Sequence, residues 1–199
     1  MASEALVFVR PCYAARVKRG CSELEGFTLG LVWQTGPCSA YDVRVFLAKS
    51  PSTQWSASAG AIYPVLRRLE KRGWVSARAE KDNARGRRVY KITPSGLAVL
   101  RGWVGPPMSR EAVTVSYDPL RSRARFLGCL NAARRTQWAT AADEALAAVE
   151  RNVADWHARF GSAAGAFEPW ITRSGELDCK ARRQWLRELK QALAGRKPR

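Results

Sequence analysis

The chain has 199 residues, of which 46% are hydrophobic and 26% are charged, a composition typical of a folded globular protein. No apolar run approaches the ~20 residues that span a bilayer, and the first apolar stretch is too short for a secretory signal, so we expect a cytoplasmic protein without a membrane segment. Lys and Arg number 34 against 17 Asp and Glu, and the resulting net charge of +17 favours a polyanion as partner.

The cysteines and the histidine limit the chemistry that the chain can carry. Five cysteines and one histidine, His157, are present, and no Cys-x-x-Cys pair occurs. A structural zinc site needs three or four such ligands at close spacing, so we expect no metal site and no cofactor. An enzyme would need an acid–base pair, a nucleophile with its base or a phosphate-binding loop. We find none of these patterns and expect no catalytic residues.

Regular patterns begin after residues 1–21, which show little periodicity and are expected to form a basic N-terminal extension. Ser22 and Glu25 have the spacing of a capping box and predict the start of a helix. Gly36 and the proline after it end that helix. Ser39 is the expected cap of a second helix.

A third helix is predicted over residues 58–72, after a turn at residues 50–53. Its apolar side chains recur at helical spacing. They are Ile62, Val65, Leu66 and Leu69. Pro64 lies inside this helix, where a proline removes one hydrogen bond and costs about 3 kcal/mol, so we expect a kink there.

A β-hairpin is expected next, because residues 74–80 and 88–92 alternate in polarity and residues 81–86 have turn chemistry. Thr93 followed by proline then predicts another helix start. The apolar stripe of that helix is expected at Leu97, Leu100 and Val104. Three helices, a basic hairpin and a further helix make the order of a winged helix-turn-helix domain, predicted over residues 22–104.

The remainder of the chain is predicted to be helical. Residues 105–117 contain Gly-Pro-Pro and are expected to form a linker, followed by a helical dimerisation or effector domain over residues 118–199. Helices are expected over residues 119–133, 137–160 and 177–193, with a loop at residues 161–174 between the last two. The long middle helix is expected to bury Ala142, Ala145, Val149, Val153, Trp156 and Phe160. The predicted fold is mainly α with a small β-hairpin wing.

The third helix and the hairpin form the candidate DNA-binding surface. A helix that buries one face and presents Tyr and Arg on the other suits the major groove of double-stranded DNA. The candidate residues are Ser58, Gly60, Tyr63, Arg67, Arg68 and Lys71 on the helix and Arg85, Arg87 and Arg88 on the hairpin. A basic helix face by itself is more often only solvated. The order of the elements together with the charge of +17 favours DNA binding.

Residues 51–75 resemble the hallmark segment of PadR-like transcriptional regulators. The residues that carry the resemblance are Gly60, Ile62, Tyr63, Pro64, Leu66, Leu69, Glu70 and Gly73. Residues 87–96 resemble that family's second wing strand and next helix start, and the whole resemblance covers about residues 24–104. Ala40 departs from the family, which usually has Gly there. The resemblance implies a homodimer on a near-palindromic operator, usually a repressor released by a small effector.

Two features of the C-terminal half leave alternatives open. The last helix either packs within the chain or forms an interface, and we favour a homodimer because three short helices would struggle to close a core alone. Each of the eight tryptophans is a core residue by default. Trp103, which ends the helix joining the two domains, is the candidate for contact with a small aromatic effector. The rival function is a non-specific architectural nucleic-acid-binding protein.

Overall fold

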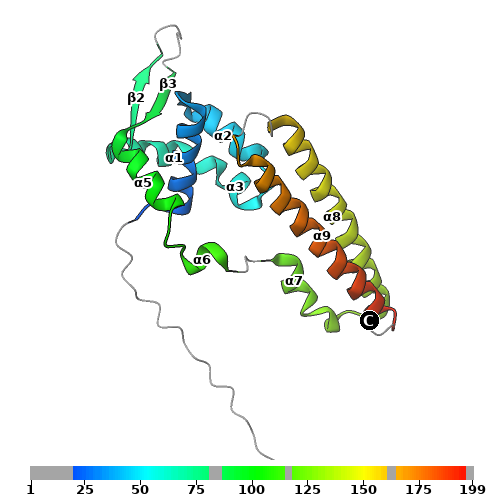
Figure 1. Ribbon diagram of the computed structural model, residues 1–199. Coiled ribbons are helices and arrows are strands. Elements are labelled where there is room, and N and C mark those ends of the chain that lie inside the picture. Colours follow the sequence, from blue (N-terminus) through cyan, green and yellow to red (C-terminus); the bar gives the residue numbers. More distant parts are fainter. Residues whose placement is uncertain (1–19, 81–86, 115–117, 161–164, 196–199) are drawn as a thin grey trace, which may run out of the picture.

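The computed structural model describes residues 20–80, 87–114, 118–160 and 165–195. Figure 1 shows an N-terminal group of helices with a small sheet and, beside it, a long pair of C-terminal helices. The predicted N-terminal extension lies outside the described residues except for its last two positions. The arrangement is mainly helical with a small wing, which confirms the predicted fold class.

The first two helices begin and end where local hydrogen bonds place them. Helix α1 spans Glu23–Thr35, and the Ser22 and Glu25 side chains each bond the other residue's backbone N–H in the predicted capping box. It ends at Gly36, whose φ of 73° favours glycine. Helix α2 spans Ala40–Lys49 and is capped by Ser39, as predicted.

The helix that carries the candidate site begins later than expected. A short helix α3, Thr53–Ser58, and a 3-10 turn η1, Ala59–Ala61, precede helix α4, Ile62–Lys71. The predicted start at Ser58 is therefore wrong, and Thr53 is helical rather than part of the turn. Pro64 is the third residue of α4, where a backbone N–H has no partner within the helix, so it breaks no hydrogen bond of α4. The change from η1 to α4 lies directly before it, and the predicted kink stays a prediction.

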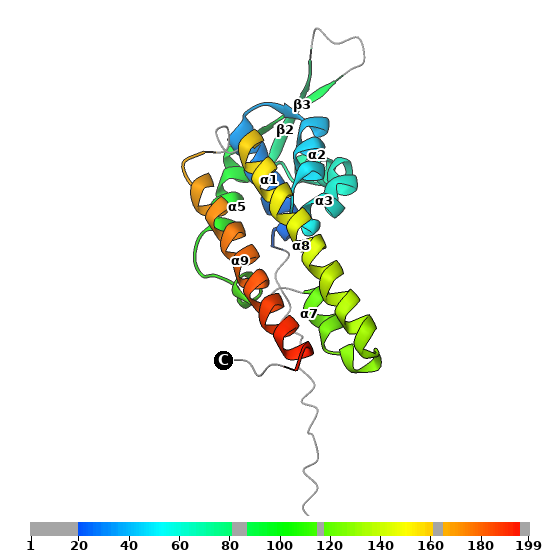
Figure 2. The same ribbon diagram turned by 90° about the vertical axis from the view of Figure 1, so that its right-hand side faces the viewer.

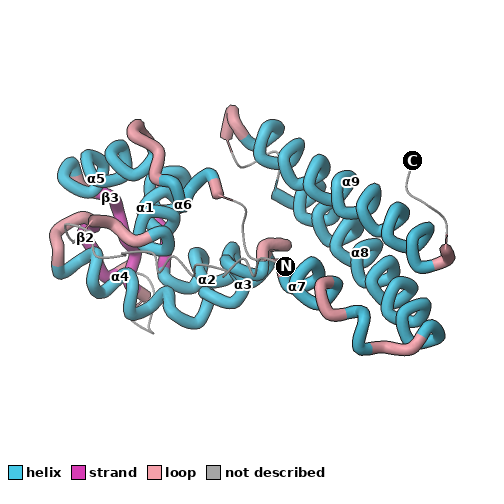
Figure 3. The backbone as a smooth tube through the Cα atoms, turned by 90° about the horizontal axis from the view of Figure 1, so that it is seen from below, coloured by secondary structure: helices cyan, strands magenta, loops and turns pink. Residues whose placement is uncertain are grey.

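The sheet has three antiparallel strands in the order β1-β3-β2. Strands β2, Val75–Ala79, and β3, Arg88–Ile92, form the predicted hairpin, and the unpredicted β1, Cys38–Ser39, pairs with β3. Helix α5, Pro94–Val104, follows the predicted cap Thr93. Seen from below in Figure 3, the strands lie among α1, α4 and α5. Val104 is exposed, so its predicted place in the buried stripe of α5 is wrong.

The C-terminal helices differ from the predicted ranges at their ends. They are α6, Arg110–Val113; α7, Pro119–Ala124; a 3-10 turn η2, Leu127–Cys129; α8, Ala132–Phe160; and α9, Glu168–Leu193. The helix predicted over 119–133 is thus broken after Ala124, and residues 168–174 of the predicted loop are helical. Figure 2 shows α8 and α9 side by side along most of their length.

The buried face of α8 is rotated from the predicted stripe. Ala139, Ala142 and Leu146 are buried, whereas Ala145 and Val149 are exposed. The reason is the position of α9, because Leu186 of that helix is fully buried against Ala142 and Leu146. Ion pairs flank this contact, with Arg183 bonding Glu150 and Lys190 bonding Asp143.

One buried carboxylate ties α1 to α4. Glu25 accepts hydrogen bonds from Arg68 Nε at 3.3 Å and from an Arg72 terminal nitrogen at 3.1 Å. Burial acts to raise the pKa of Glu25, but the bonds from Ser22 and Arg68 and the charge of Arg72 outweigh it, so the pKa lies below its ordinary value of 4.5. The carboxylate is therefore ionised at neutral pH and fixes α4 against α1.

We predict that Glu25→Gln lowers the free energy of unfolding at pH 7 by about 1–3 kcal/mol, the usual contribution of hydrogen bonds to a charged group. A lowered folded-state pKa stabilises above the unfolded-state pKa and loses that effect as the pH falls. The difference between the unmodified protein and the variant should therefore shrink below about pH 4.5. Urea unfolding across pH 3–7 measures it, with the exposed Glu144→Gln as control. A difference independent of pH would contradict the ionic role.

Candidate nucleic-acid interface

Helix α4 presents two basic rows with different roles. Arg68 and Arg72, one turn apart, face α1 and are held by Glu25. Tyr63, Arg67 and Lys71 lie on another side and are exposed to solvent. Across the described ranges, neither Arg67 nor Lys71 has a carboxylate within ion-pair distance. This second row, which we call the outer row, therefore offers two unneutralised charges and a phenol to an external anion.

The two small candidate residues lie just before α4. Ser58 does not cap this helix, because its hydroxyl donates to the Gln54 carbonyl at 2.7 Å within α3. Its predicted place at the helix start is therefore wrong, although its contact with DNA stays a prediction. A Cβ on Gly60 would meet no atom within 4 Å, so packing inside the chain does not require glycine there. Gly60 is exposed, which fits close approach by a partner from outside.

The candidate wing arginines are ion-paired at the base of the hairpin. Arg87 donates to Asp42 at 2.7 Å and has Glu80 at 3.7 Å, and Arg88 donates to Glu70 at 2.6 Å. Both arginines keep roughly half of their side-chain surface exposed. They therefore attach β3 to α2 and α4 and still have donors free to reach an anion. Arg85 lies outside the described residues.

The sequence did not reveal that acids hold the arginines of α4 and of the wing. Glu25 and Asp42 lie more than forty residues from their arginine partners, and no periodic pattern links such positions. A local signal existed for Asp42, because Ser39 and Asp42 form a second capping box. Partial burial acts to raise the pKa of Asp42, but the bonds from Ser39 and Arg87 outweigh it and lower the pKa.

Trp103 packs against the N-terminal helix. Its indole N–H donates to Glu23 at 3.2 Å, and its ring lies so close to Gly26 that a Cβ there would be 2.4 Å away. This contact joins α5 to α1 and accounts for the tryptophan by packing. Its predicted contact with an effector stays a prediction.

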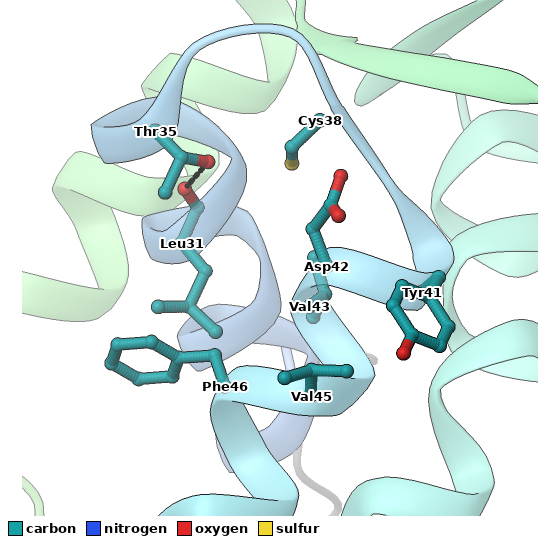
Figure 4. Close-up of a pocket in the computed structure, with 8 residues that line it drawn as sticks. All are labelled: Leu31, Thr35, Cys38, Tyr41, Asp42, Val43, Val45 and Phe46. Atoms are coloured by element: carbon teal, nitrogen blue, oxygen red, sulfur yellow. Dashed lines mark hydrogen bonds between the residues drawn. The ribbon is translucent and has the colours of Figure 1, made fainter.

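A cavity opens between α1 and α2, on the side of α2 that carries Asp42. Its volume is about 240 Å³. Figure 4 shows the residues that line it, which are Leu31, Thr35, Cys38, Tyr41, Asp42, Val43, Val45 and Phe46. Burial raises the pKa of the Cys38 thiol, so this wall is uncharged at neutral pH. The cavity is thus apolar with one charged residue, Asp42.

Other kinds of site have no support in the described ranges. None of the helices there combines the length and apolar character that crossing a bilayer requires. No three His, Cys, Asp or Glu side chains gather there as metal ligands would.

Known proteins share both the sequence pattern and the fold. A curated relative, the negative transcriptional regulator PadR of Bacillus subtilis (strain 168), is 27% identical over 105 residues, which cover 52% of this chain and 56% of the relative. The chain thus matches only about half the length of that relative.

Solved structures extend the likeness over most of the chain. A PadR-like transcriptional regulator from Bacillus cereus superposes with a TM-score of 0.70 at 19% identity, covering 86% of this chain and 98% of the other. Bacillus subtilis PadR in complex with operator DNA gives 0.65 at 20% identity over 86% and 97%. The same protein with p-coumaric acid gives 0.57 at 21% identity over 86% and 93%. At these identities the likeness concerns the fold.

The region that carries the outer row and the wing also matches a protein family. Residues 29–102 match the model of the transcriptional regulator PadR-like family. Together with the winged helix fold and the PadR relative, this match shows that residues 29–102 are similar to the PadR-like family of transcriptional regulators.

Proposed function

We propose that this protein is a sequence-specific DNA-binding regulator of transcription that acts in the cytoplasm as a repressor. It binds a near-palindromic operator as a homodimer, and a small effector releases it. The observation that carries the proposal is the outer row of α4, Tyr63, Arg67 and Lys71, exposed and without ion-pair partners across the described ranges. The operator complex of Bacillus subtilis PadR, which shares the fold, supports DNA as the partner.

Each basic element has its own task in the proposed complex. Helix α4 lies in the major groove, where Arg67 is able to donate two hydrogen bonds to a guanine. Lys71 binds phosphate as a point charge. The wing arginines Arg87 and Arg88 contact the neighbouring backbone, and contacts of this kind fix register without reading sequence. Arg68 holds α4 in place through Glu25 and contributes to DNA binding only indirectly.

The proposed dimer forms through the C-terminal helices. Large apolar side chains there are exposed in the single chain: Val149, Phe167, Trp170, Ile171 and Leu177. Trp170 alone is 72% exposed. Apolar side chains gathered on the surface of a folded chain mark an interface. A twofold dimer presents two α4 helices about 34 Å apart, one turn of DNA.

We expect the protein to have the mass of a dimer in light scattering at micromolar concentration. Replacing an exposed apolar contact with a charge, in Ile171→Glu, should shift the protein towards the 22.1 kDa monomer. The matched control is Met108→Glu, which lies before the C-terminal helix pair and should leave the mass unchanged. A monomeric mass for the unmodified protein would refute the dimer.

We predict that the protein prefers the DNA upstream of its own gene over a scrambled fragment by a thousandfold or more at physiological salt, as specific regulators do. A mobility-shift titration measures this preference. A steep loss of affinity with salt, combined with equal affinity for both fragments and no preferred site in a genome-wide binding map, would instead favour the architectural protein that the charge of +17 also suits.

Substitution of single arginines distinguishes contacts that recognise a base from contacts that only bind the DNA backbone. Arg67→Ala should weaken operator binding by about 1–3 kcal/mol and relax the sequence requirement at one position. Arg87→Ala should weaken all sequences alike, because its contact is with phosphate. Mobility shifts with an operator and its single-base variants measure both. The control is Arg68→Ala, which should lower stability more than base discrimination. A uniform loss for Arg67→Ala would assign it to the backbone instead.

A further inference from the structure

The cavity between α1 and α2 is partly open to the surface, with an apolar lining and one carboxylate. Its volume of about 240 Å³ exceeds the roughly 150 Å³ in which an engineered apolar cavity holds benzene. Leu31, Val45 and Phe46 provide apolar walls, and Asp42 supplies a carboxylate. The cavity therefore has room for one aromatic ring with a short side chain.

Asp42 gives the cavity a preference of charge. Its pKa is lowered, so it is a carboxylate at neutral pH. It accepts bonds from the backbone N–H and hydroxyl of Ser39 at 2.9 and 2.8 Å, and among the described residues it also accepts one from Arg87 at 2.7 Å. Once Arg87 has left Asp42, the freed carboxylate attracts a cationic ligand and repels an anionic one.

The Asp42–Arg87 pair is open to competition. The two side chains are 44% and 42% exposed, and ion pairs with this much solvent contribute little to stability. Arg87 also has a second acid, Glu80, at 3.7 Å on the neighbouring strand. Arg87 can thus exchange Asp42 for Glu80 without losing an anionic partner, and the exchange would end its link between β3 and α2.

One residue of the cavity wall contacts the C-terminal helices. Phe46 lines it, and its ring meets Trp156 of α8 edge-on with the ring centroids 4.9 Å apart. Asp42 and Phe46 are four residues apart in α2, so they lie on one face of that helix. A ligand in the cavity is therefore in contact with a residue held to the wing and with a residue held to α8.

We propose that the α1–α2 cavity binds a small molecule made of one apolar ring and a primary amine. The amine displaces Arg87 from Asp42, and the loss of this ion pair loosens the wing. The wing then has to be ordered again when DNA binds, which weakens binding. The DNA half of this proposal rests on the proposed function, whereas ligand binding does not. Coupling is reciprocal, so operator DNA weakens amine binding by the same factor.

Calorimetry with the full chain and no DNA tests the site. The probes are 2-phenylethylamine, 2-phenylethanol and phenylacetate, which differ mainly in charge. We expect the amine to bind most tightly and phenylacetate at least tenfold more weakly. Asp42→Asn keeps an oxygen that can accept the bonds from Ser39, and it should lower the affinity for the amine to that for the alcohol. Val45→Phe, which fills the cavity, should abolish binding of all three, and thermal melting checks that both variants fold.

Glu144→Gln is the matched control for the carboxylate. It removes an exposed acid of α8 that neither lines the cavity nor pairs with Arg87, and it should leave amine affinity unchanged. Tighter binding of phenylacetate, no binding of any probe, or an amine affinity that Asp42→Asn does not alter would overturn the site.

A mobility shift in saturating amine tests the link to DNA. We expect operator affinity to fall about fivefold or more, the lower range of allosteric coupling. The fall should be absent in Asp42→Asn. An operator affinity that the amine leaves unchanged would overturn the loosening of the wing. If the protein binds no operator at all, the proposed function fails while the calorimetry still decides the cavity.

Discussion

The buried side chains Ile62, Val65, Leu66 and Leu69 fix which side of α4 faces the core, and Glu25 then determines which of its arginines are held against α1. The carboxylate is almost fully buried, and it accepts bonds from Ser22 and from both arginines. Successive residues of a helix are turned by about 100°. Once Arg68 is turned towards α1, Arg67 is turned about 100° from it, in one row with Tyr63 and Lys71. A single acid at the start of α1 thus divides a basic helix into a structural row and an outer row.

In the wing, too, acidic side chains hold arginines from distant parts of the sequence. Asp42 of α2 holds Arg87, and Glu70 of α4 holds Arg88, so β3 is attached to both helices that flank it. The strands themselves are short, and β1 has only two residues. A hairpin of this size has marginal stability alone. Burial of Val75 and Tyr90 therefore holds the wing beside α4, and the partly exposed ion pairs set the position of its base.

The parts of the fold that depend on local bonds were predictable from the sequence. Ser22, Ser39 and Thr93 each cap a helix through an atom at most three residues away, and each was predicted. The wrong predictions concern positions whose structure depends on contacts with distant segments of the chain. Leu186 of α9 selects Ala142 and Leu146 as the buried face of α8, and the 3-10 turn before Ile62 gives Pro64 an acceptable place. In the candidate site, the outer row followed from periodicity, but the role of Arg68 depends on Glu25, 43 residues earlier.

Helix α2 is the part of the chain through which the wing and the C-terminal helices meet. Asp42 connects it to Arg87 at the base of the hairpin, and one turn later Phe46 connects it to Trp156 of α8. Both residues line the cavity. A rigid helix with contacts at both ends transmits a displacement, whereas a packed core resists one. In the proposed complex the outer row belongs to α4, so movement of the wing relative to that row is the simplest way for the C-terminal half to influence DNA binding.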